Sequence, residues 1–242
     1  MRLEAGFDWR VPLVVLGAGR ARRLGRLAAG RSKVALRLRE DRPERLLDVL
    51  VEAWAPWASE LWLVVRSEDE ELARLLAEQP IPGRLVLQPE PRGTAAAVAA
   101  MAAELPARFL VVLGDCLVAG RMAGPASPFA GLAVWPGAAR NAVRANYAVR
   151  LAGERVLAVE EKPAEPGPEQ VCGLGVYFFD RALLEAMCEL PPDRQGRREI
   201  TDGLAFALGS GVALWATRLH GRYVNVNNPD DLRQAGGWFL QP

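Results

Sequence analysis

Short apolar runs alternate with amphipathic segments in the first half of the chain. The apolar runs cover residues 11–16, 61–65, 84–87 and 109–113, and the amphipathic segments cover residues 43–54, 68–77 and 94–105. Runs of this length are typical of buried strands, and the segments between them have the apolar spacing of helices. The alternation predicts an α/β fold with a largely parallel sheet and helices on both faces, with Asp41 as a cap ahead of the first helix.

The pattern changes after Asp115, where Gly and Pro interrupt the chain more often. Shorter apolar runs at residues 131–135, 147–151, 156–159 and 175–179 predict antiparallel or edge strands, and residues 181–189, 200–208 and 229–235 predict helices. The sequence contains no repeat, and its one linker-like loop is at residues 163–168. We therefore expect a single domain over residues 1–242.

Composition and charge narrow the class of protein. With 50% hydrophobic and 24% charged residues the chain has the composition of an ordinary globular protein, and no apolar stretch is long enough for a membrane span. The first apolar run is too short for a signal-peptide core, so the cytoplasm is the expected location. The formal charge of +1 argues against an extended nucleic-acid surface but allows a local anion pocket. The sequence leaves a homo-oligomer open.

Three cysteines, Cys116, Cys172 and Cys188, are odd in number and far apart. This spacing predicts neither a disulfide framework nor a thiolate metal site. We expect reduced, partly buried thiols.

A glycine-containing loop follows the first predicted strand. It contains Leu16, Gly17, Ala18 and Gly19, then Arg20, Arg22 and Arg23, with Lys33 a short distance on. Backbone N–H groups and arginines at the carboxyl end of a parallel strand can hold a polyphosphate. The loop lacks the third glycine of a dinucleotide fingerprint and the Gly-Lys-Ser/Thr of a P-loop. A structural turn with solvated arginines is the alternative.

A second loop, residues 88–94, joins a predicted strand to an alanine-rich helix. Thr94 can cap that helix, and Gln88 with the loop backbone can read the edge of a base. The alternative is a simple capped turn.

Polar residues at three further positions suit a metal ion. Asp115 follows an apolar strand, where one carboxylate suits a Mg²⁺ that keeps most of its waters and shares phosphates; capping of the next turn is the alternative. Asn225 and Asn227 follow another apolar run, and their oxygens can complete a hard-cation shell. Asparagines before a proline are also ordinary turn formers.

Lys162 lies beside Glu161 at the end of a predicted strand, in a chain with few lysines. Its ammonium can neutralise a substrate phosphate while Glu161 accepts from hydroxyls. A surface charge cluster is the alternative.

Taken in order, these segments resemble the sugar-1-phosphate nucleotidylyltransferase family over roughly residues 11–235. That family has a Leu-Ala-Ala-Gly-x-Gly-Thr-Arg-Leu loop followed by Pro-Lys, then Gln-x-x-x-x-Gly-Thr-Ala, a strand ending Gly-Asp, Glu-Lys-Pro, Gly-x-Tyr-x-Phe and Asp-x-Gly-x-Pro-Glu-Asp-Leu. The ordered set of motifs is far more specific to that family than any single motif. The end of the chain is also similar to molybdopterin guanylyltransferases.

The resemblance implies a Rossmann-like three-layer αβα sandwich with a mostly parallel mixed sheet. Its nucleotide-binding half would be about residues 11–115 and its acceptor-binding half about residues 116–235. It implies catalytic roles for Arg23, Lys33 and Lys162, nucleotide contacts from residues 16–19 and from Gln88, Gly93 and Thr94, and acceptor contacts from Glu161, Lys162 and Gly175. It also implies Mg²⁺ on Asp115, with Asn225 or Asn227 as the second ligand.

Several positions depart from the family pattern: Gly17, Ala21, Ser32 before Lys33, and Ala148. Ala21 matters most, because its Cβ limits how closely the loop backbone can approach a phosphate.

The resulting hypothesis is transfer of a nucleoside monophosphate from a nucleoside triphosphate to a sugar-1-phosphate. A cytidylyl- or guanylyltransferase acting on a phosphoalcohol, a phosphonate or a cofactor phosphate is the nearest alternative. A non-catalytic nucleotide-sugar-binding homologue is the second. The sequence does not identify the base of the nucleoside triphosphate. Gln88, Gly93 and Thr94 suit uridine or thymidine, while the stretch from Arg92 to Ala95 is also similar to guanylyltransferases.

Overall fold

The computed structural model describes residues 3–19, 22–28, 30–67, 70–88, 90, 92–123 and 129–240 of the chain. Helices and strands are mixed along the sequence, so the predicted α/β class is confirmed. The chain divides into two compact units. Unit 1 comprises Met1–Pro91, Val112–Arg121 and Gly221–Pro242, and unit 2 comprises Arg92–Val111 and Met122–His220. One domain over the whole chain and the three-layer sandwich stay predictions.

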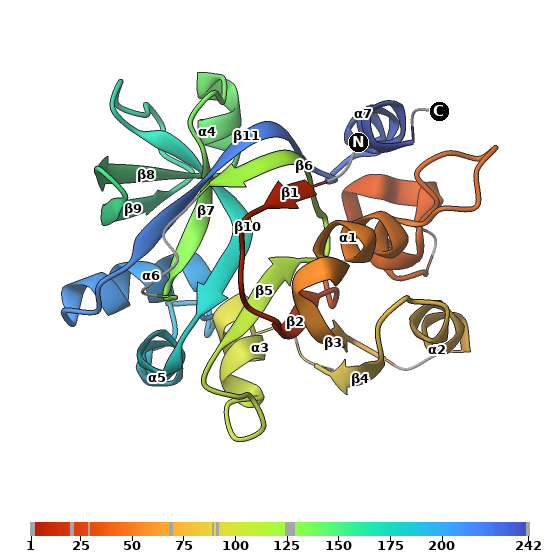
Figure 1. Ribbon diagram of the computed structural model, residues 1–242, viewed down its shortest axis with the longest axis horizontal. Coiled ribbons are helices and arrows are strands. Elements are labelled where there is room, and N and C mark those ends of the chain that lie inside the picture. The colour runs from red at the N-terminus through yellow and green to blue at the C-terminus, as the bar shows by residue number, and fades with distance from the viewer. Residues whose placement is uncertain are drawn as a thin grey trace. The chain divides into compact units, whose positions relative to one another are not determined.

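Unit 1 contains a run of parallel strands. β2 (Val11–Leu16) pairs with β3 (Ala58–Val65), and β3 pairs with β4 (Gly83–Leu87). Figure 1 shows these three strands side by side. A further strand, β5 (Phe109–Leu113), begins in unit 2 and ends in unit 1. Five of the six residues of β2 are buried, which explains its uninterrupted apolar sequence.

The helices of unit 1 pack on these strands and on short 3₁₀ turns. They are α1 (Leu46–Trp54), α2 (Glu70–Ala77), α7 (Pro229–Phe239), and the turns η1 (Arg22–Leu27), η2 (Lys33–Ala35) and η3 (Ala55–Trp57). α1 contacts η2 and η3, α2 contacts β4, and α7 contacts η1. A further run has the order β1 (Leu3–Ala5), β6 (Cys116–Ala123) and β11 (Trp215–Asn225).

Unit 2 contains antiparallel strands. β8 (Tyr147–Ala152) pairs with β9 (Arg155–Glu161) and with β10 (Val171–Phe179), and β10 also pairs with β7 (Gly131–Trp135). β7 and β11 are parallel. The antiparallel strands expected after Asp115 are therefore confirmed.

Three helices of unit 2 form one packed group, visible in Figure 1. α3 (Thr94–Ala100) and α6 (Ile200–Gly209) both pack on α5 (Arg181–Glu189), and α6 also contacts β9. A fourth helix, α4 (Arg140–Ala145), contacts β8 and β10. Phe109 and Phe179 stack in the core, with their ring centroids 5.0 Å apart.

Most predicted elements are present, with shifted ends. The first helix begins at Leu46, the third ends at Ala100, and the last extends to Phe239. The predicted start of the second helix at Glu68 lies outside the described residues. The strands β1 and β6 and the helix α4 were not predicted.

The prediction that Asp41 caps the first helix is wrong. α1 has Arg45 at its N-cap, and the Asp48 carboxylate accepts a hydrogen bond from the Arg45 backbone N–H at 2.7 Å. Asp41 instead accepts two hydrogen bonds from Arg39.

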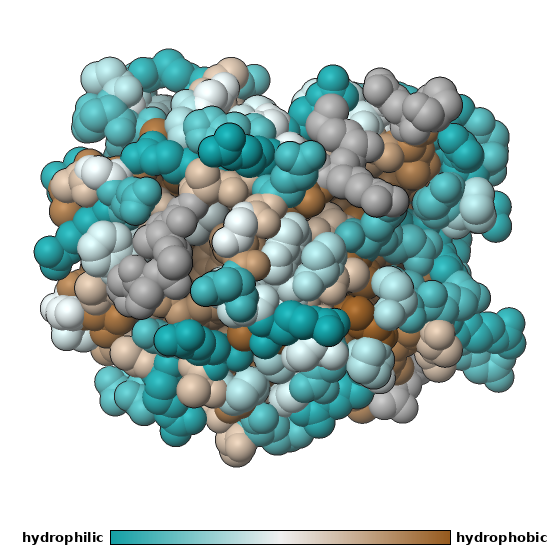
Figure 2. Space-filling view, viewed as in Figure 1, coloured by the Kyte–Doolittle hydropathy of each residue, from teal (hydrophilic) through white to brown (hydrophobic). Residues whose placement is uncertain are grey.

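On the face shown in Figure 2, hydrophilic residues predominate and hydrophobic residues lie in small groups between them. None of the described helices combines the length and apolar character needed to cross a bilayer. Cys116 and Cys172 are buried, Cys188 is exposed, and all three are free thiols. Burial raises the pKa of the Cys172 thiol to about 12, so it stays protonated and unreactive at neutral pH.

The ends of the strands in unit 1 are packed closely around Gly114, directly after β5. Its N–H donates to the Leu16 carbonyl at 3.0 Å. A Cβ at Gly114 would lie 2.9 Å from the Leu16 oxygen and 3.0 Å from the Gly17 Cα. The backbone of β2 therefore leaves no room for a side chain at this position.

We expect Gly114→Ala to lower the free energy of unfolding by about 1–3 kcal/mol, because the added methyl group overpacks two backbones. Urea unfolding measures this. Gly237→Ala is the control: Gly237 is exposed in α7, and no atom lies within 4 Å of the place that an added methyl group would take, so stability should be unchanged or higher. Equal stability of the Gly114→Ala variant and the unchanged protein would contradict the packing argument.

Candidate active site

Lys33 connects three segments of unit 1 that are distant in sequence. Its Nζ donates to the Asp115 Oδ2 at 2.9 Å and to the Val226 carbonyl at 2.8 Å. The Val226 N–H in turn donates to the Asp115 carbonyl at 2.8 Å. We call these three residues, together with Asn225, the Lys33 junction. Lys33 is the first residue of η2, Asp115 lies between β5 and β6, and Val226 follows β11.

The ion pair of the Lys33 junction is shielded from solvent. The side chains of Lys33 and Asp115 are 12% and 23% exposed. Two charges in such a site need good geometry and further hydrogen bonds to offset their lost hydration. The Val226 carbonyl supplies one of these bonds.

Asn225 is the asparagine that faces Asp115. With its amide nitrogen turned toward the carboxylate, it donates to the Asp115 oxygens at 3.3 and 3.2 Å. Asn227 lies one step further on: its side chain donates to the Asn225 carbonyl at 3.5 Å, and its N–H donates to Asp231 at the start of α7. The structure therefore brings the Asn225 side chain to Asp115, and the Asn227 side chain lies beside Asn225.

The glycine loop is described in part. The Gly17 N–H donates to the Val64 carbonyl at 2.8 Å, so this donor is already used within the fold. Ala18 is buried and Gly19 is exposed. The positions of Arg20 and Ala21 lie outside the described residues, and so does the side chain of Arg22.

Arg23 is exposed within η1 and has no ion-pair partner among the residues that the structure describes. Gln88 directly follows β4, and its N–H donates to the Val65 carbonyl at 2.7 Å. Both residues belong to unit 1. Gln88 thus lies at the carboxyl ends of two parallel strands.

Gly93 and Thr94, in unit 2, begin α3, and the prediction that Thr94 caps this helix is wrong. Gly93 occupies the N-cap position, with no side-chain cap, and Thr94 is the first helical residue. The Thr94 hydroxyl instead accepts from the N–H of Ile200, the first residue of α6. Glu199, which the sequence reasoning missed, accepts from the Thr94 N–H and hydroxyl. A glutamate directly before a predicted helix was the only local signal.

Glu161 is the last residue of β9 in unit 2, and Lys162 directly follows it. Their side chains are 45% and 65% exposed and form an ion pair at 3.0 Å. Lys162 has a φ of 43°, the only positive φ of a non-glycine residue in the described parts of the chain. Its N–H donates to the Asn146 carbonyl at 2.9 Å, which helps to hold this strained conformation.

Gly175 is buried in β10, within a stretch where the pairing with β7 shifts register between Gly173 and Tyr177. Such irregularities are over-represented next to active sites. A Cβ on nearby Gly173 would lie 2.0 Å from the Tyr147 ring, so this part of β10 accepts no side chain at that position.

Acidic residues surround the start of α6. Burial, followed by the negative charges of Glu199, Glu161 and Asp193, raises the pKa of Asp202. The segment from Glu199 to Asp202 is therefore close enough to Glu161 for their charges to interact.

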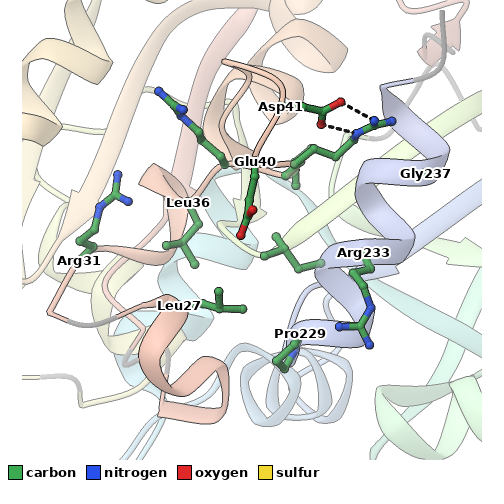
Figure 3. A pocket seen from close by; sticks show the side chains of 12 residues that line it. Leu27, Arg31, Leu36, Glu40, Asp41, Pro229, Arg233 and Gly237 are labelled. Carbon is green, nitrogen blue, oxygen red and sulfur yellow. Dashed lines mark hydrogen bonds and ion pairs between the residues drawn. The ribbon is translucent and has the colours of Figure 1, made fainter.

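A separate cavity of about 690 Å³ lies within unit 1, shown in Figure 3. Its lining includes the apolar side chains of Leu36 and Leu232 together with several arginines. Arg31 pairs with Glu71, Arg39 with Asp41 and Arg233 with Asp230. These three arginines are therefore paired with carboxylates, and none of the junction residues lines this cavity.

The sequence matches the model of the nucleotidyl transferase family over residues 13–236. The chain therefore belongs to the nucleotidyl transferase family, and the predicted class of enzyme, a nucleotidyltransferase, is confirmed at the level of the family.

Curated relatives align over part of their length. Glucose-1-phosphate thymidylyltransferase of Streptomyces griseus is 31% identical over 87 residues, which cover 36% of this chain and 24% of that protein. Bifunctional protein GlmU of Methanocaldococcus jannaschii is 22% identical over 227 residues, which cover 94% of this chain and 54% of that protein. The chain thus spans between about a quarter and about half of these relatives.

Solved structures share the fold at low sequence identity. The inositol-1-phosphate CTP transferase from T. maritima has a TM-score of 0.73 at 14% identity, covering 93% of this chain and 92% of that one. A UDP-glucose pyrophosphorylase complexed with UDP-glucose has a TM-score of 0.74 at 16% identity, covering 96% of this chain and 98% of that one.

The strained backbone at Lys162 gives a prediction about stability. Lys162→Gly should be more stable than Lys162→Ala by about 1 kcal/mol, because glycine alone has no Cβ penalty at a positive φ. Urea unfolding of the two variants measures the difference. Glu161 in β9 is the matched control, and there the glycine variant should be the less stable of the pair. A Lys162→Gly variant less stable than Lys162→Ala would show that the conformation carries no strain.

Proposed function

We propose that this protein transfers a nucleoside monophosphate from a nucleoside triphosphate to a sugar-1-phosphate, giving a nucleoside diphosphate sugar and pyrophosphate. The Lys33 junction carries the proposal. It combines a carboxylate, an ammonium and an amide at the carboxyl ends of strands, in a chain of the nucleotidyl transferase family. Open α/β sheets bind ligands at this edge.

The donor set of the junction fits a hard divalent cation such as Mg²⁺. No group of three or more His, Cys, Asp or Glu side chains suited to a metal occurs among the described residues. One carboxylate and one amide oxygen nevertheless suit an ion that keeps its waters and shares phosphate oxygens. Lys33 contacts the Asp115 Oδ2, while the Oδ1 accepts from Asn225 and, at 3.6 Å, from the Cys116 thiol. A cation at the Oδ1 would replace the Asn225 donor, and Asn225 can then turn its amide oxygen toward the cation. Bound there, Mg²⁺ would neutralise charge on the phosphates of the triphosphate.

Lys33 and Arg23 act on the triphosphate in this proposal. The Lys33 ammonium, held by Asp115 and Val226, is a positioned point charge for a phosphate oxygen. Arg23 is exposed and can make a forked contact with two phosphate oxygens. The backbone of residues 16–19 lines the phosphates in this proposal, and Gly19 is the exposed residue of the four.

Gln88, Gly93 and Thr94 select the base in this proposal. The N–H groups of Thr94, Ala95 and Ala96 already donate to Glu199 or to the Arg198 carbonyl. The start of α3 therefore has no N–H left for a phosphate or for a base edge, so in this proposal the loop contacts the base through the backbone around Gly93 and through Gln88.

Lys162, Glu161 and Gly175 bind the acceptor in this proposal. The Lys162 ammonium neutralises the acceptor phosphate, and Glu161 accepts from sugar hydroxyls. Gly175 lines the sugar pocket. We also propose the three-layer sandwich with a mostly parallel mixed sheet, and a nucleotide-binding half ahead of an acceptor-binding half.

The reaction needs no covalent enzyme intermediate. An oxygen of the acceptor phosphate attacks the α-phosphorus, a new P–O bond forms, and the bond to the β-phosphate oxygen breaks as pyrophosphate leaves. Arg23, Lys33 and Lys162 neutralise charge and orient the two phosphates, so catalysis rests on positioning and electrostatics.

A different acceptor is the second candidate. The structural similarity to an inositol-1-phosphate CTP transferase favours it, because that enzyme's named substrate is a phosphoalcohol. Its fold matches this chain about as well as that of the UDP-glucose pyrophosphorylase.

A panel of nucleoside triphosphates and phosphorylated acceptors, scored by pyrophosphate release with Mg²⁺, tests the proposal. We expect release with a hexose-1-phosphate and one preferred base. Pyrophosphate release with a phosphoalcohol phosphate alone would contradict the sugar-1-phosphate acceptor and support the second candidate. Tight nucleotide binding without release for any pair would reject turnover altogether.

Asp115→Asn tests the role of the junction. We expect turnover to fall on the order of 10²-fold or more, because Asp115 would bind the cation directly and even a residue that only supports a metal ligand costs about 10–100-fold when lost. The fold should persist, since asparagine keeps the volume and Val226 still accepts from Lys33. Asp41→Asn, at an exposed ion pair, is the control with unchanged turnover. Full activity of Asp115→Asn, or of the unchanged protein in excess chelator, would contradict the metal assignment.

A further inference from the structure

Two consecutive residues of unit 2, Arg198 and Glu199, hold the loop that begins α3. The Arg198 N–H donates to the Arg92 carbonyl at 2.8 Å. The Arg198 carbonyl accepts from the N–H groups of Ala95 and Ala96 at 3.0 and 3.3 Å. Backbone contacts alone therefore fix the loop on both sides of Gly93.

The Glu199 side chain adds the contacts that fix Thr94. Its Oε2 accepts from the Thr94 N–H at 3.0 Å and from the Thr94 Oγ1 at 2.9 Å. The same Oγ1 accepts from the Ile200 N–H at 2.9 Å. The first turns of α3 and α6 are thus capped by each other's residues, and the Arg197 guanidinium is 3.9 Å from the Glu199 Oε1.

Gly93 leaves this arrangement little freedom. Its φ is 103°, and a Cβ there would lie 2.2 Å from the Arg198 oxygen. The loop backbone and residues 198–199 therefore adopt one close-packed conformation that no side chain at position 93 could accommodate.

We infer that Glu199 is a positioning residue for base selection: it orients Gly93 and Thr94 without touching the nucleotide. The inference rests on the proposed function, in which the loop around Gly93 and Thr94 contacts the base. A hydrogen bond to a charged acceptor is stronger than a neutral one, so the Glu199 carboxylate is the dominant side-chain restraint on the Thr94 end of the loop. Selection between bases needs donors and acceptors held in place, because a loosely held loop fits several base edges equally well.

Three variants and one control test the inference, with each nucleoside triphosphate of the panel as the probe. In Glu199→Ala, the ratio of kcat/KM between the preferred and the next-best triphosphate should fall by about tenfold or more, through a higher KM for the preferred one. The KM for the acceptor should not change. Thr94→Ser should retain normal discrimination between bases, because it keeps the hydroxyl. Thr94→Val should lose discrimination as Glu199→Ala does.

Glu185→Gln is the matched control. Glu185 lies on α5 in the same unit and forms an exposed ion pair with Arg181, so its loss should leave all constants unchanged. A role confined to stability would lower the melting temperature of Glu199→Ala and leave the ratio between bases intact, which would overturn the inference.

Hydrogen exchange measures whether Glu199 restrains the start of α3, independently of its effect on base preference. The N–H groups of residues 94–96 should exchange faster in Glu199→Ala than in the unchanged protein, and equal protection would overturn the restraint itself. If the unchanged protein releases no pyrophosphate with any pair, the proposed function fails. The ratio of dissociation constants for the same triphosphates, measured by calorimetry, then decides whether Glu199 still sets base preference.

Discussion

The ammonium of Lys33 is the contact on which the geometry of the proposed phosphate site depends. It links η2 to the end of β5 through a carboxylate 82 residues away and to the end of β11 through a carbonyl 193 residues away. Because the ion pair is largely shielded from water, removing one member would leave a partly buried charge without its partner. A substitution at either end is therefore expected to affect the site more than the surrounding core.

The sequence predicted best those elements whose form is decided locally. The bounds of β2, β5, β7 and α5 agree with the apolar runs, because a fully buried strand or an amphipathic helix needs only its own residues to produce the pattern. The strand β6 was missed because Gly120 and Arg121 interrupt its apolar run. The caps at Asp41 and Thr94 were wrong for a different reason. The first helix begins later than expected, so Asp48, three residues after the N-cap Arg45, makes the capping contact. The start of α3 is satisfied by Glu199, which only the tertiary structure brings to Thr94.

The candidate site could be predicted in part, because an ordered set of motifs carries information that no single loop does. The sequence left Asn225 and Asn227 equivalent, and only the folded structure shows that Asn225, the last residue of β11, faces Asp115. It also gave no reason to connect Glu199 with Thr94, which is 105 positions earlier. This contact forms because the N-termini of α3 and α6 pack against each other, and a single sequence does not show which helix ends are neighbours.

The identity of residue 225 affects the charge balance of the junction. As an asparagine it donates to the Asp115 carboxylate at 3.2 Å, so the junction with one ammonium and one carboxylate is neutral without a cation. An aspartate at the same position would place two carboxylates at that distance, and like charges so close raise the pKa of one of them unless a cation intervenes. The asparagine thus lets the strand ends form in the absence of metal. It also leaves the affinity for a cation to Asp115 and to the phosphates that a substrate brings. We therefore expect metal binding to this chain to be weak alone and strengthened by the triphosphate, because some of the oxygens that Mg²⁺ prefers would come from the substrate.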